Sequence, residues 1–209
     1  MKIFMSLVLA AIPAIGHTIT YDPSLPRLFQ TIEVSIGGNV ISVNAGQIGV
    51  RIDGTLPALV YCADPLTWLQ TGPTPVTAVT ESQFPNGGRL AWLYNTYGPA
   101  VLLGSDAAAL QLAIWEVILD NNVDDLDAGQ TRTTANTDPQ VKMLAAAMLQ
   151  ASVAQTDTGV RFYVPDLGPG YSQTLLHASS PGLVQAPEPA NALLAGAGLL
   201  LAGALRRRH

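Results

Sequence analysis

AAALQLAIWEVIL, residues 107–119, is apolar around almost its whole circumference when it is read as a helix. Ser105 is the predicted N-cap, and Asp106 lies in the first turn, where a carboxylate is favourable. A helix that is apolar on all sides is buried inside a domain rather than laid on its surface. The rest of the chain is therefore expected to fold around residues 107–119.

Segments of alternating apolar and polar residues lie on both sides of this helix and predict β-strands. The expected strands cover residues 31–36, 39–43, 48–52, 58–61, 159–164 and 172–176. Gly37-Gly38 joins the first two as a hairpin. Strands, then helices, then strands predict an α+β domain, β-rich and antiparallel, with a small helical insert.

Two further helices are expected around the central one. Residues 89–97 form a short helix, and Asp138-Pro139 begins another that runs over residues 140–153. Residues 71–85 are rich in Thr and Pro and are predicted to form an irregular loop. Residues 120–127 (DNNVDDLD) begin like a calcium loop but lack its glycine and its final glutamate, so they predict a solvated acidic loop. We predict neither a metal site nor a cofactor.

Gln111 and Cys62 are the two residues that need a special explanation. Gln111 is the one polar side chain on an apolar helix face, and a buried amide without a partner costs about 1–3 kcal/mol. Cys62 is the only cysteine of the chain and ends a predicted buried strand. A cysteine sulfur held against a glutamine carbonyl can expel ammonia and leave an internal thioester, provided that water is excluded.

Tyr61-Cys62-Ala63-Asp64 and the segment 110–117 (LQLAIWEV) resemble the two signature segments of bacterial thioester domains. Residues 91–95 (AWLYN), between them, also resemble that family. The resemblance implies a β-rich domain with a Cys62–Gln111 thioester and covalent adhesion to a surface. It also implies that Tyr61, Trp92 and Trp115 pack around the bond.

The resemblance implies a protein that acts once and is not an enzyme. The nucleophile expected to open the bond is a surface amine or a polysaccharide hydroxyl. One alternative is a structural surface protein that keeps the fold without the bond. Another is a secreted cysteine hydrolase that pairs Cys62 with His177.

The charge balance excludes one class of partner. Between His17 and Ala186 there are six Lys and Arg residues against fourteen Asp and Glu residues, a net charge near −8. Such a surface repels phosphate backbones, so nucleic-acid binding is not expected.

The N-terminal end is typical of a secretory signal peptide. Lys2 is followed by an apolar run to Ile15, and Ala14 and Gly16 place small residues before a cut at His17. Residues 1–16 are therefore predicted to be a signal peptide, and residues 17–184 the exported domain.

The C-terminal end, residues 185–209, combines a stiff hinge, an apolar helix and a basic stop. Pro187, Glu188 and Pro189 form the hinge, residues 190–205 carry no charge, and Arg206, Arg207 and Arg208 follow. The pattern predicts a single transmembrane helix with a cytoplasmic C-terminus. It resembles the PEP-CTERM sorting signal, which implies an exosortase-type enzyme as a partner. The protein would be anchored in the inner membrane and then moved to the cell surface or matrix.

Overall fold

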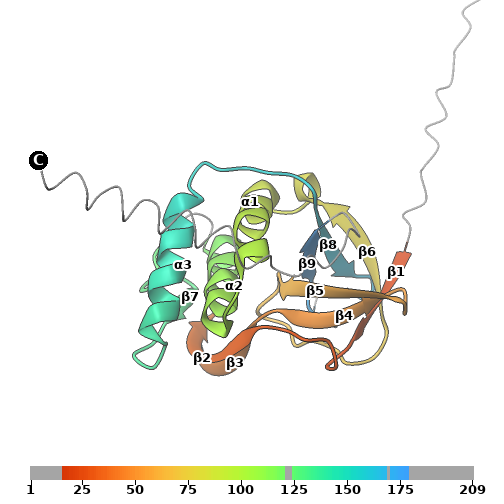
Figure 1. The fold of residues 1–209 in the computed structure, drawn as a ribbon, viewed down its shortest axis with the longest axis horizontal. Coiled ribbons are helices and arrows are strands. Elements are labelled where there is room, and N and C mark those ends of the chain that lie inside the picture. The colour runs from red at the N-terminus through yellow and green to blue at the C-terminus, as the bar shows by residue number, and fades with distance from the viewer. Residues whose placement is uncertain (1–15, 121–123, 169, 179–209) are drawn as a thin grey trace, which may run out of the picture.

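A closed antiparallel barrel forms one half of the domain (Figure 1). The computed structural model describes residues 16–120, 124–168 and 170–178. Six strands close the barrel in the order β1-β4-β5-β9-β8-β6. Their bounds are β1 Gly16–Tyr21, β4 Ile48–Ile52, β5 Leu56–Cys62, β6 Thr74–Thr80, β8 Val160–Pro165 and β9 Leu175–Ala178.

A three-stranded sheet, in the order β3-β2-β7, lies beside the barrel. It consists of β2 (Phe29–Ile36), β3 (Asn39–Gly46) and the short β7 (Thr131–Thr133). Gly37 and Gly38 turn the chain between β2 and β3 with φ of 57° and 85°, a region that favours glycine. The predicted hairpin is therefore confirmed, with Ile36 paired to Asn39.

Helix α2 (Gly104–Leu119) lies at the centre of the domain and contacts α1, α3, β2 and β3. Its residues from Ala107 to Val117 are all buried, as its apolar circumference predicted. α1 (Gly87–Tyr97) and α3 (Pro139–Ala151) complete the helical half, which lies beside the barrel in Figure 1. Two short 3₁₀ turns, Glu81–Gln83 and Gly98–Ala100, flank α1.

The predicted start of the central helix was too late, and its predicted N-cap was wrong by two residues. The helix begins at Gly104, with Leu103 and not Ser105 at the N-cap position. The carboxylate of Asp106 accepts hydrogen bonds from the backbone N–H groups of Leu102 and Leu103. Asp106 therefore caps the helix from inside its first turn, and a serine cap is not needed.

Residues 71–85 were predicted to be a loop and contain strand β6 instead. Thr74 and Val76 are buried, and the strand pairs with both β1 and β8. Pro75 lacks an N–H group, but its carbonyl accepts a hydrogen bond from the N–H of Asp166. Strand β1 was not predicted, and β9 lies three residues beyond the predicted start at residue 172.

Both predicted targeting segments lie largely outside the described residues. The signal peptide falls on residues 1–15, except for Gly16, which is the first residue of β1. The sorting tail, with Pro187, Glu188, Pro189 and Arg206 to Arg208, falls wholly in residues 179–209. Within the described ranges, no helix is long and apolar enough to cross a membrane.

Candidate functional site: the Cys62–Gln111 pair

Cys62 is the last residue of β5, at the point where the barrel meets the helical half of the domain. Its neighbour across the sheet is Leu175 of β9. The side chain is a free thiol and the residue is 2% exposed, so bulk water does not reach the sulfur. The position meets the first requirement of a thioester, the exclusion of water.

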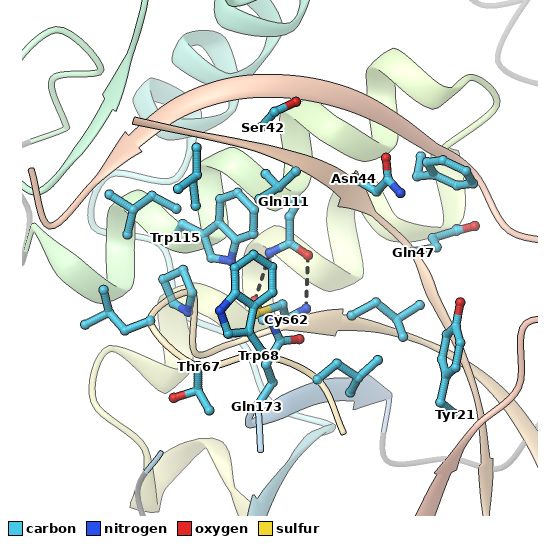
Figure 2. Close-up of a pocket in the computed structure, with 18 of the residues that line it drawn as sticks. Tyr21, Ser42, Asn44, Gln47, Cys62, Thr67, Trp68, Gln111, Trp115 and Gln173 are labelled. Carbon is cyan, nitrogen blue, oxygen red and sulfur yellow. Dashed lines mark hydrogen bonds between the residues drawn. The ribbon is translucent and has the colours of Figure 1, made fainter. Parts of the chain in front are cut away.

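Gln111 lies one turn into the buried part of α2 and faces Cys62 directly (Figure 2). The backbone N–H of Cys62 donates to Oε1 of Gln111 at 3.0 Å, and Nε2 of Gln111 donates to the carbonyl oxygen of Cys62 at 2.8 Å. Gln111 is 1% exposed. The two residues that the sequence paired, 49 positions apart, are therefore in direct contact.

This geometry polarises the carbonyl carbon that a thioester requires. A backbone N–H aimed at Oε1 stabilises negative charge on that oxygen when a nucleophile adds to the carbon. In an attack of Cys62 on this carbon, the same residue would supply both the sulfur and a donor of the oxyanion-hole type.

The Cys62 thiol is held in its protonated form. Burial raises its pKa to about 12, while the N–H of Asp64 and the indole N–H of Trp115 act in the opposite direction. The Asp64 N–H donates to Sγ at 3.4 Å. A thiolate is therefore costly here, and both donors lie where they would stabilise sulfur as it leaves a thioester.

The three aromatic residues predicted to surround the bond have different surroundings. Trp115 lines the cavity beside the pair and is 5% exposed. Tyr61 is buried and packs edge-to-face against Tyr94, with ring centroids 6.0 Å apart. Trp92 is half-buried against Tyr97 and does not line the cavity. Only Trp115 has a place at the site itself.

A cavity of about 630 Å³ opens onto the pair. Its wall comes from β2, β3, the segment after β5 and the approach to β9, and it includes Cys62, Gln111 and Trp115. In Figure 2, Trp115 and Tyr21 lie on opposite sides of the pair, and Ser42 and Asn44 extend from β3. A molecule that enters this cavity lies next to the pair, although Cys62 and Gln111 themselves are almost completely buried.

Three residues of the site were not predicted from the sequence. Trp68 and Gln173 line the cavity, and Asp64 contributes the N–H that meets the sulfur. Of these three residues, only Trp68 could have been noticed in the sequence, as a tryptophan within the Pro- and Thr-rich stretch that follows Cys62. Gln173 has no local pattern, because only the pairing of β9 with β5 brings its segment to Cys62.

His177 is not part of the site. It follows Leu175 along β9 and pairs with Arg161 of β8. Burial lowers its pKa, and among the described residues no hydrogen bond joins it to Cys62. The cysteine–histidine pair of a hydrolase is therefore absent from this part of the chain.

The acidic segment after α2 is less solvated than predicted. Asp120 is buried, and its carboxylate accepts hydrogen bonds from the backbone N–H groups of Gln130 and Thr131. Asp124 forms an ion pair with Arg89 at 2.8 Å. In the described ranges, no group of three or more His, Cys, Asp or Glu side chains is arranged to hold a metal ion.

Two solved structures from Streptococcus pyogenes are similar to this chain. One is the N-terminal thioester domain of fibronectin-binding protein SfbI, at 12% identity and a TM-score of 0.40, covering 76% of this chain and 100% of that one. The other is the N-terminal domain of the pilus tip adhesin Cpa, at 16% identity and a TM-score of 0.43, covering 78% of this chain and 92% of that one. No family model and no curated protein matches the sequence.

Proposed function

We propose that this protein carries an internal Cys62–Gln111 thioester and uses it once to attach itself covalently to a surface nucleophile. The observation that carries the proposal is the pair of reciprocal hydrogen bonds between Gln111 and the Cys62 backbone, in which both residues are almost completely buried. The protein is then a surface adhesin or matrix cross-linker rather than a turnover enzyme.

The thioester forms when the Cys62 sulfur replaces the amide nitrogen of Gln111. Sγ of Cys62 bonds to Cδ of Gln111, and the bond from Cδ to Nε2 breaks. The thiol proton passes to the departing nitrogen, which leaves as ammonia. Since the raised pKa keeps that proton on the sulfur, the proton is present for transfer when the nitrogen leaves.

The same electrostatics favour survival of the bond. Hydrolysis releases the sulfur as a thiolate into a buried position where the charged form is unfavourable. A nucleophile held in the cavity overcomes this barrier by proximity, whereas bulk water has little access to the buried pair.

We further propose that the chain is exported through residues 1–16 and sorted through residues 185–209. An exosortase-type enzyme would act on the segment around Pro187, Glu188 and Pro189. The domain would be held at the inner membrane until that step and displayed on the cell surface or matrix afterwards.

The test is the intact mass of the complete chain before and after treatment with methylamine. We expect a mass lower than that of the plain sequence by one ammonia. Methylamine restores the thiol and leaves the chain one methylene group heavier than the plain sequence. Cys62→Ala and Gln111→Ala each abolish the mass deficit and the methylamine reaction. A plain mass with a titratable thiol in the folded protein contradicts the proposal.

One observation favours a second candidate, a structural surface protein without the bond. The two hydrogen bonds to Cys62 give both polar atoms of the Gln111 amide a partner while the side chain stays an unmodified glutamine. The mass measurement separates the two candidates, because only the thioester removes an ammonia.

A further inference from the structure

We infer that the cavity beside the Cys62–Gln111 pair is a saccharide subsite, and that the nucleophile it delivers to Gln111 is a hydroxyl of a polysaccharide. The covalent step rests on the function proposed above, whereas the non-covalent subsite does not. Three properties of the cavity wall carry the inference: its aromatic rings, a buried polar atom without a partner, and its charge.

Aromatic side chains form platforms in the wall and at its rim. Trp68 is 72% exposed although it lines the cavity, and Tyr21 and Phe29 line it as well. An exposed tryptophan at a concave site indicates a binding surface rather than a core position. The apolar face of a pyranose ring packs on such a platform, while its hydroxyls remain free at the ring edge.

One buried polar atom of the wall has no hydrogen-bond partner among the described residues. It is Oε1 of Gln173, which accepts. A saccharide hydroxyl can donate to this oxygen and still accept a hydrogen bond from a neighbouring group.

The charge of the wall disfavours a lysine nucleophile. Arg27 is the one charged side chain among the lining residues, and its guanidinium lies 5.4 Å and 5.5 Å from the ring centroids of Tyr21 and Phe29. An ammonium group would meet a cation and no carboxylate. The other polar lining residues bear neutral amide or hydroxyl groups: Asn39, Ser42, Asn44, Gln47, Thr67 and Gln173.

The covalent step needs no reactant besides the thioester and the hydroxyl. The hydroxyl oxygen bonds to Cδ of Gln111, the bond from Cδ to Sγ breaks, and the hydroxyl proton passes to the sulfur. The products are an ester of the former Gln111 side chain and a free Cys62 thiol. Gln173 is a positioning residue in this step, because its Oε1 can accept the hydrogen bond of the incoming hydroxyl.

The non-covalent subsite is tested with the complete chain carrying Cys62→Ala, which cannot form the bond. Its binding to a panel of immobilised oligosaccharides from bacterial exopolysaccharides is compared with its binding to a lysine-rich peptide. We expect binding to at least one oligosaccharide, weakened at least tenfold by adding Trp68→Ala. Leu102→Ala, which truncates an exposed apolar side chain that does not line the cavity, is the matched control and leaves binding unchanged. Absence of oligosaccharide binding, tighter binding of the peptide, or an unaffected Trp68→Ala variant overturns the inference.

The covalent step is tested by incubating the wild-type chain with the bound oligosaccharide and measuring its intact mass. We expect an ester adduct of the oligosaccharide, which hydroxylamine cleaves. The adduct should form at least tenfold more slowly in Gln173→Leu than in the wild-type chain. If methylamine opens the bond but the saccharide does not add, the inference is wrong and the proposed function stands. If the saccharide binds but methylamine leaves the mass unchanged, the proposed thioester is wrong and the subsite stands.

Discussion

The side-chain amide of Gln111 donates one hydrogen bond to the backbone of Cys62 and accepts one from it. These two bonds hold helix α2 against the end of β5, and neither of them involves the Cys62 side chain. Both backbone groups of Cys62 would otherwise be buried without these partners. Gln111 therefore has a structural task that can be measured apart from any chemistry.

The structural task of Gln111 is best measured in a Cys62→Ala background, which keeps both backbone groups and removes the thioester. Adding Gln111→Ala is expected to lower the free energy of unfolding by about 2–4 kcal/mol, because two buried backbone groups lose their partners. Chemical denaturation gives the value. Gln111→Met fills the volume without the hydrogen bonds and separates their loss from a cavity effect. A Gln111→Met variant as stable as the background would show that the hydrogen bonds contribute nothing.

The indole N–H of Trp115 is expected to speed the opening of the thioester. It lowers the pKa of the Cys62 thiol and so stabilises the sulfur as it leaves. Trp115→Phe removes this donor and should slow methylamine incorporation about tenfold, as followed by intact mass. Trp92→Phe is the control, since Trp92 does not line the cavity. Equal rates in the two variants would exclude the proposed role of Trp115.

Glu116 is expected to make stability depend on pH between about 4.5 and 8. Burial, and then the nearby Asp120, raises its pKa from 4.5 to about 8. In that window the folded state holds a proton that the unfolded state has released, so the free energy of unfolding falls as the pH rises, by at most about 1.4 kcal/mol per pH unit.

Glu116→Gln is the matched variant for this pH dependence. It keeps the oxygen that accepts a hydrogen bond from the Asp125 N–H and removes the titration. Denaturation curves at several pH values should show a flatter profile for the variant between pH 5 and 8. The opposite contribution of His177, whose pKa is lowered, is common to both proteins and cancels in the difference. Parallel profiles would show that Glu116 titrates normally.

Gly104 is expected to be required for packing rather than for its backbone angles. A Cβ at this position would lie 2.4 Å from the carbonyl oxygen of Phe29, on the neighbouring strand β2. Gly104→Ala should therefore cost about 1–3 kcal/mol of stability through overpacking. Gly72→Ala, where a Cβ meets no atom within 4 Å, is the control, with an expected change within about 0.5 kcal/mol. Similar losses in both variants would contradict the packing explanation.

The sequence was sufficient to predict the centre of the domain. The apolar circumference of residues 107–119 predicted a buried helix, and the polar exception on it, Gln111, had to find a buried partner. Cys62 and Gln111 could be paired because each was the unusual residue of its own segment. The cavity around them could not be predicted, since Tyr21, Trp68 and Gln173 meet there only through tertiary folding.

The closure of the barrel was also beyond local sequence patterns. The residues of β6 read as a loop because Thr and Pro dominate them, and the tertiary pairing with β1 and β8 overrides that local preference. β1 begins at Gly16, the small residue that was predicted to lie just before the signal-peptide cleavage site. Local periodicity describes single strands, whereas closing a barrel depends on partners far away in the chain.

Helix α2 also determines how the domain would respond to mechanical tension. Gln111 lies in the interior of this helix, and α2 contacts α1, α3, β2 and β3. A tether bonded to Gln111 would pull on the middle of the molecule instead of on a terminus. Because α2 is buried, such a pull would be shared among all the elements packed around it before any one of them could be peeled away.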